Sequence, residues 1–81
     1  MILHVIKAEY VGDYRLHLWF SDNTDAEVDL GGALTGPIFS PLKDVSTFRQ
    51  FRLEGHTVAW ANGADFAPEY LYELAQSTMP A

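Results

Sequence analysis

One stretch decides how the chain folds: Trp60-Ala61-Asn62-Gly63-Ala64-Asp65-Phe66-Ala67-Pro68-Glu69-Tyr70-Leu71. Residues 57–60 have the β-branched and aromatic content of a strand, and Asn62-Gly63 is typical of a tight turn because both residues tolerate positive φ. Asp65 is the expected N-cap of a helix over residues 68–76, in which Pro68 occupies the first turn and its missing N–H costs nothing. One face of this helix should be apolar and lie on a sheet: Phe66, Tyr70, Leu71 and Leu74.

Three segments before this stretch alternate apolar and polar residues, as strands do. They cover residues 2–10, 14–20 and 24–30. The apolar faces of the second and third segments lie on one side only if the loop between them has an odd length, most simply residues 21–23. That register predicts three pairs on the other face: Arg15 with Asp29, His17 with Glu27, and Trp19 with Asp25.

The first hairpin follows by the same reasoning. A loop of residues 11–13 keeps the apolar faces together and places Glu9 opposite Arg15. The same register places Val5 opposite Trp19.

The middle of the chain predicts a loop, a short helix and a second hairpin. Glycines and prolines break any periodicity over residues 31–42, and Asp44 is a good N-cap for a helix over residues 45–50 that buries Val45. A second hairpin with its loop at residues 54–57 pairs Leu53 with Val58. The expected fold class is α+β, with an antiparallel three-stranded meander, a second short hairpin, one short central helix and a C-terminal helix.

Residues 1–76 are expected to form a single domain, since 81 residues allow no more than one. Residues 77–81 are expected to be a frayed tail. Whether the two hairpins form one sheet or two is open at this point.

Composition limits the functions that the chain can have. The absence of cysteine excludes disulfides, thiolate zinc sites and cysteine nucleophiles. A net charge of −6 opposes direct binding of nucleic acid and favours a basic protein partner. The first residues lack the features of a signal peptide, and no apolar run is long enough to span a membrane, so a cytoplasmic location is expected.

Several motifs, taken together, resemble a known family. They are Leu16-His17-Leu18-Trp19-Phe20-Ser21-Asp22-Asn23, then Val28-Asp29-Leu30, then residues 60–72, with Val5 and Phe48. Over nearly its whole length the chain resembles the small bacterial family known as domain of unknown function 2442. The resemblance implies a compact α+β domain of bacterial or phage origin and supplies no catalytic residues.

The same resemblance implies two genetic settings. Some relatives carry a helix-turn-helix DNA-binding domain after this one, and such a domain is not expected here because the sequence ends at Ala81. Stand-alone members often lie beside a gene for another small protein, an arrangement like that of toxin–antitoxin pairs.

Two features on the charged face of the meander are candidates for binding. Three apolar residues cluster there, and either a loop or the last helix covers them or they meet a partner, because tryptophan is enriched at interface hot spots. Three carboxylates form a row along one strand, which is either a solvated face or a stripe that guides a basic partner. The candidate interaction surface is therefore Leu3, Val5, Trp19, Asp25, Glu27 and Asp29.

No catalytic, cofactor or metal site is predicted. The histidines His4, His17 and His56 lie on separate elements without the spacing of metal ligands. No serine lies in a nucleophile-elbow motif, and a row of carboxylates along one strand is not a facing pair in a cleft. Gly31-Gly32 lacks the lysine and spacing of a phosphate-binding loop.

The sequence thus favours a non-enzymatic protein-interaction module, antitoxin-like or regulatory, whose partner is a basic protein encoded next door. A homodimer is a further expectation for so small a domain. The alternative is a small ligand-binding domain or enzyme with a site between residues 31–42 and the turn at residues 60–65. A third interpretation is a regulator that acts on nucleic acid through a partner.

Overall fold

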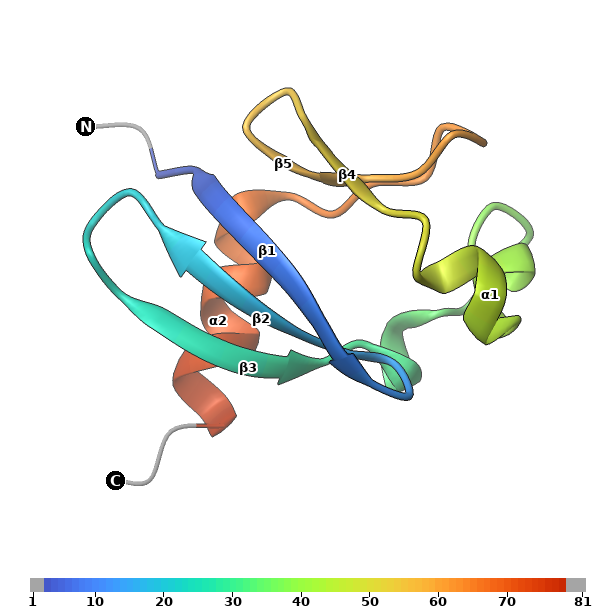
Figure 1. Ribbon diagram of the computed structural model, residues 1–81, viewed down its shortest axis with the longest axis horizontal. Helices are drawn as coiled ribbons and strands as arrows, with labels where there is room; N and C mark the ends of the chain where they lie inside the picture. The colour runs from blue at the N-terminus through green and yellow to red at the C-terminus, as the bar shows by residue number, and fades with distance from the viewer. Residues whose placement is uncertain (1–2, 79–81) are drawn as a thin grey trace.

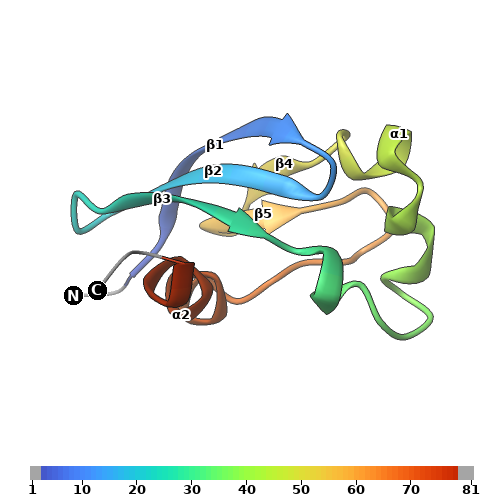
Figure 2. The same cartoon turned by 90° about the horizontal axis from the view of Figure 1, so that it is seen from below.

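The computed structural model describes residues 3–78 and confirms the α+β class (Figure 1). The strands form two separate sheets, one of three strands in the order β1-β2-β3 and one of two, β4-β5. Figure 2 shows α2 beneath the three-stranded sheet and α1 at the opposite end of the molecule. The elements are β1 (Val5–Gly12), β2 (Arg15–Phe20), β3 (Asp25–Asp29), two 3₁₀ turns (Gly31–Ala33 and Ser40–Lys43), α1 (Val45–Phe48), β4 (Arg52–Glu54), β5 (Thr57–Ala59) and α2 (Pro68–Thr78).

The register predicted for β2 and β3 is confirmed. Arg15 lies opposite Asp29, His17 opposite Glu27, and Trp19 opposite Asp25. The three-residue loop is closed by a hydrogen bond from the Phe20 N–H to the Thr24 carbonyl at 2.8 Å. Asn23 supplies the positive φ of this turn, at 71°.

The register predicted for the first hairpin is wrong. Glu9 lies opposite His17, and Gly12 lies opposite Arg15, so the turn consists of two residues rather than three. Gly12 has a φ of 140°, which favours glycine, and Asp13 has a φ of 48°; these conformations move the turn toward the second strand. A bulge at Val11 adds the residue that keeps the apolar faces together.

A second bulge changes the face on which Val5 lies. The irregularity at Ile6 pairs Val5 with Phe20 instead of Trp19. The Val5 side chain therefore turns into the core and is 3% exposed, whereas Ile6 is 57% exposed. The predicted start of this strand at Ile2 lies outside the described residues.

The core lies between the three-stranded sheet, α2 and the short sheet. Leu16, Leu18 and Val28 contribute from the sheet, while Leu71 and Ala75 contribute from α2. A ring cluster joins the two ends of this core, because Phe48 packs edge-on against Tyr14 and tilted against Trp60.

Two apolar residues expected to be buried are substantially exposed. Val45 is 37% exposed and Tyr70 is 40% exposed, although Tyr70 stacks on Phe66. Leu53 pairs with Val58 as predicted, but it is 43% exposed, since β5 is the buried strand of this pair and β4 the exposed one. The loop of this hairpin is shortened to Gly55 and His56, both with positive φ.

The predicted strand, turn and last helix are present, with one correction. Asn62 Oδ1 accepts from the Ala64 N–H, and Gly63 has a φ of 91°, so the turn forms as expected. Asp65 is not the N-cap of α2: its backbone forms a bridge with Ala59, and the helix begins only at Pro68. The helix continues to Thr78, beyond the predicted end at residue 76, and residues 79–81 of the expected tail lie outside the described residues.

Candidate interaction surface

The three-stranded sheet has one face on α2 and one face on solvent. Alternation along β2 and β3 places most apolar side chains toward the core and the polar ones away from it. The solvent side, called here the outer face, combines charged residues with one large ring: Lys7 and Glu9 from β1, Arg15, His17 and Trp19 from β2, and Asp25, Glu27 and Asp29 from β3.

Trp19 lies at the centre of one cross-strand row of this face. Lys7 is its partner on β1 and Asp25 is its partner on β3. The Lys7 ammonium lies over the Trp19 ring at 4.7 Å from the centroid. The His17 ring lies 4.3 Å from the Trp19 ring at an interplanar angle of 42°. The indole is partly exposed and is held between two polar side chains.

The carboxylates of the outer face make diagonal rather than direct contacts. Arg15 Nη1 lies 3.0 Å from Glu27 Oε1, and His17 Nε2 lies 2.7 Å from Asp25 Oδ2. Asp29 Oδ1 accepts from the Gly31 N–H at 2.9 Å, which ends the strand. Four carboxylates and two Lys/Arg cations leave the face acidic.

The outer face brings together four of the six predicted surface residues. Trp19 and the three carboxylates of β3 share it, but Val5 does not, because the bulge at Ile6 turns it into the core. Leu3 is partly buried and packs against the core cluster. The sequence did not predict that Lys7 contacts Trp19. The predicted register placed Val5 opposite Trp19, whereas the observed register places Lys7 there.

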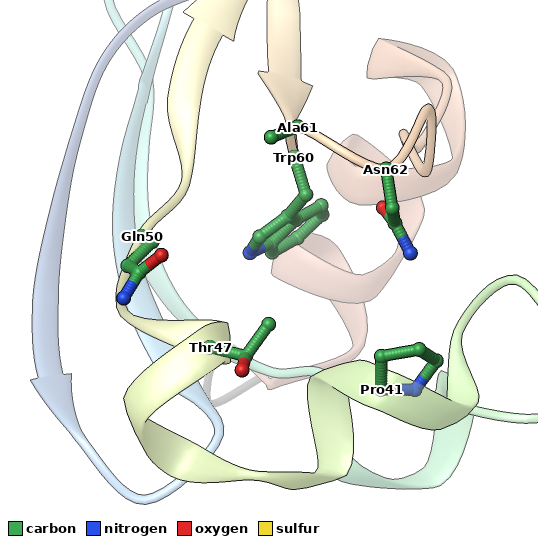
Figure 3. Close-up of a pocket in the computed structure, with 6 residues that line it drawn as sticks. All are labelled: Pro41, Thr47, Gln50, Trp60, Ala61 and Asn62. Carbon is green, nitrogen blue, oxygen red and sulfur yellow. The ribbon is translucent and has the colours of Figure 1, made fainter.

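A small pocket lies where the sequence suggested an alternative site (Figure 3). It has a volume of about 150 Å³ and is lined by Pro41, Thr47, Gln50, Trp60, Ala61 and Asn62. The lining contains no carboxylate, histidine, lysine or arginine. Pockets for small molecules usually measure about 300–1,000 Å³, so this one has room for little more than a side chain.

The polar groups of the pocket are largely engaged in holding the fold. Trp60 Nε1–H donates to the Phe48 carbonyl at 2.9 Å, which joins the turn to α1. Asn62 Nδ2 donates to the Ile38 carbonyl at 2.9 Å, which joins the turn to the preceding loop. The pocket is therefore explained as the space left where the turn at Asn62 packs against α1 and against the loop that contains Ile38.

The three histidines do not converge. His17 contacts Asp25 on the outer face, whereas His4 and His56 lie with ring centroids 4.6 Å apart and tilted by 31°, where the β4–β5 turn meets the start of β1. Within residues 3–78, no three His, Cys, Asp or Glu side chains are grouped so as to hold a metal ion. In the same part of the chain, no helix has the length and apolarity needed to cross a membrane.

One further site holds the sheet to the last helix. Asp22, in the turn between β2 and β3, accepts from the Thr24 hydroxyl, from the Thr24 N–H at 3.0 Å and from the Tyr72 hydroxyl at 2.8 Å. The hydrogen bond from the Thr24 side chain, followed by that from Tyr72, lowers the pKa of the Asp22 carboxyl below its ordinary value.

The chain matches the model of one protein family and is similar to a solved structure. A family model described as "Protein of unknown function (DUF2442)" matches residues 5–77. No curated protein matches the chain. The fold is similar to the crystal structure of "Putative DNA Binding Protein NE0471" from Nitrosomonas europaea ATCC 19718, with a TM-score of 0.81 and 25% sequence identity. The similarity covers 94% of this chain and 50% of that one, so the chain spans half the length of that protein.

Proposed function

We propose that this chain, which belongs to the DUF2442 family, is a non-enzymatic protein-interaction module that binds a basic partner through the outer face of its three-stranded sheet. The observation that carries the proposal is the position of Trp19 on that face. A partly exposed indole sits in the middle of a charged, acidic surface, where a solvated sheet face needs no large ring. Tryptophan is among the residues most enriched at interface hot spots.

The charge of the molecule supports a basic partner. A net charge of −6 attracts positively charged proteins over a distance, and the acidic row of β3 lies beside the proposed anchor. The ordinary explanation of the same row is a solvated strand, since exposed ion pairs such as Arg15–Glu27 contribute about 0–1 kcal/mol each. A partly exposed indole in the middle of the outer face is not explained by a solvated strand, and it therefore favours the explanation that this face binds a partner.

The finer form of the proposal is an antitoxin-like or regulatory role, with a partner encoded by a neighbouring gene. The alternative, an enzyme or ligand-binding domain, has only the pocket at Trp60 in its support. That pocket is small, and its lining carries no group suited to general acid–base catalysis.

A nucleic-acid role is a second candidate, because the similar structure from Nitrosomonas europaea carries DNA binding in its name. The similarity covers half of that protein, and the acidic outer face of this chain repels phosphates. A gel-shift assay on DNA, with the chain alone and with its captured partner, separates direct from indirect binding. The interaction-module proposal expects no shift with the chain alone.

Co-purification from a native lysate, with and without charge reversal, tests the proposal. The variant D25K/E27K/D29K should lose the partner that the native chain retains. The control E69K/E73K reverses two charges on exposed residues of α2 and should keep the partner. Circular dichroism checks that each variant is folded. The proposal is overturned if no specific partner is captured, or if both variants keep it equally.

A further inference from the structure

The outer face already contains a cation bound to its own aromatic ring. Lys7 Nζ lies 4.7 Å from the centroid of the Trp19 ring and 3.4 Å from Glu9 Oε1. An indole face attracts an organic cation, and a neighbouring carboxylate adds a charge-assisted contact. The position beside Trp19 therefore accepts a positive charge, and in the free protein Lys7 supplies it.

The contact with Lys7 is exposed and exchangeable. The side chains of Lys7 and Glu9 are 59% and 57% exposed, and a flexible lysine on a strand surface gains little from such pairs. If Lys7 moves away, the face of the Trp19 ring is open to another cation, and the Glu9 carboxylate is left without the ammonium group that it contacts. Asp25, directly across from Trp19 on β3, lies on the other side of the same row.

We propose that Trp19 is the anchor for an arginine side chain of the protein partner, and that Lys7 holds this place until the partner displaces it. The inference rests on the proposed function and specifies the group that the outer face recognises. The incoming guanidinium stacks on the indole and pairs with the carboxylate of Glu9, as Lys7 does in the free chain.

Arginine suits this place better than lysine. A guanidinium is planar, is more weakly hydrated than an ammonium, and can stack on a ring while it forms a two-pronged contact with a carboxylate. Because an ammonium is a compact, strongly hydrated charge, a lysine from a partner would gain less on displacing Lys7. An arginine from the partner therefore binds this place more tightly than Lys7 does and can displace it. A lysine from the partner would bind about as tightly as Lys7 and would gain nothing from the exchange.

A titration with a synthetic peptide tests the inference. The probe is a hexapeptide of alternating glycine and arginine with both ends blocked, and the control peptides carry lysine or uncharged citrulline in place of arginine. Binding is followed by the NMR signal of the Trp19 indole N–H in the full chain, with the signal of the buried Trp60 as an internal reference. We expect the arginine peptide to shift the Trp19 signal, the lysine peptide to do so more weakly, and the citrulline peptide to leave it unchanged.

Two lysine variants give the sharper test. Lys7→Ala should bind the arginine peptide roughly two- to fivefold more tightly, because the competing cation is removed. Lys43→Ala changes the net charge by the same amount at an exposed position away from the outer face, and its affinity should stay near that of the native chain. Trp19→Ala should bind at least severalfold more weakly than native.

Each contrary result has its own meaning. Equal tightening by the two lysine variants would mean that only overall charge matters, which overturns the arginine anchor. Binding without a shift of the Trp19 signal, or without dependence on Trp19, overturns it as well. In either case the proposed function stands if D25K/E27K/D29K still loses the native partner, and it falls if that variant keeps the partner or if no specific partner is captured.

Discussion

At the scale of single residues, Trp60 joins the turn at Asn62-Gly63 to α1 and to the rest of the core. Its ring is 3% exposed, and its N–H donates to the Phe48 carbonyl at 2.9 Å. A buried carbonyl that loses its donor costs about 1–3 kcal/mol, because desolvation is no longer compensated.

Trp60→Phe should therefore lower the free energy of unfolding by about 1–3 kcal/mol, and the melting temperature by roughly 4–8 °C per kcal/mol for a domain of this size. Urea and thermal denaturation measure the change. Trp19→Phe is the matched control, since it makes the same replacement on the outer face, and its effect should be clearly smaller. Equal losses for the two variants would contradict the assigned role of the Trp60 hydrogen bond.

Asp22 makes a pH-dependent contribution. Its pKa is lowered mainly by the hydrogen bond from the Thr24 side chain and then by that from Tyr72. A group with a lowered folded-state pKa stabilises the protein at pH values above its unfolded pKa, and this contribution disappears as the pH falls through the folded pKa.

Asp22→Asn should accordingly be less stable than the native chain above about pH 5, and the difference should shrink as the pH falls below about 4. Urea denaturation across this range measures it. Tyr72→Phe should show a smaller loss with the same pH dependence, because Asp22 keeps its contacts with Thr24. A difference that grows toward acid pH would rule out this account.

At the scale of elements, the two hairpins of the large sheet differ in how far the sequence predicts them. β2 and β3 alternate without interruption, so only one register keeps both apolar faces in the core, and that register is observed. β1 carries two bulges, one at Ile6 and one at Val11 beside the positive-φ residues Gly12 and Asp13, and neither is visible in an alternation of residue types.

The candidate surface could likewise be predicted from the sequence only in part. Trp19 and the carboxylates of β3 follow from the hairpin that was predicted correctly, whereas Lys7 next to Trp19 and the burial of Val5 depend on the bulges of β1. The N-cap of α2 was misplaced for a related reason. Asp65 has the right residue type for a cap, but its backbone pairs with Ala59, so the helix starts only at Pro68.

A double-mutant cycle tests the register at this scale. Arg15 contacts Glu27 diagonally at 3.0 Å, although Asp29 lies directly opposite it. Alanine replacements should give a coupling of about 0.2–1 kcal/mol for Arg15 with Glu27 and a smaller one for Arg15 with Asp29. The coupling should weaken in roughly 1 M salt. A stronger coupling to Asp29 would be inconsistent with the observed geometry.

At the scale of the whole molecule, the outer face also bears on self-association. A symmetric contact through this face would bring two acidic rows together, and like charges that face one another destabilise an interface. The homodimer favoured by the small size of the domain is therefore not expected to form through this face, and we expect the isolated chain to be a monomer in dilute buffer. Analytical ultracentrifugation of the native chain and Trp19→Ala should give the same monomer mass, and a native dimer that Trp19→Ala dissociates would contradict this expectation.

The central claim is that a protein partner binds the outer face, and site-specific photo-crosslinking in cells tests it most directly. A photoreactive amino acid replaces Asp25 on the outer face, Gln50 at the pocket or Glu73 on α2, all at exposed positions. The account predicts one discrete adduct from position 25, and none from positions 50 and 73. An adduct formed only from position 50 or position 73 would place the partner on another surface and contradict the account.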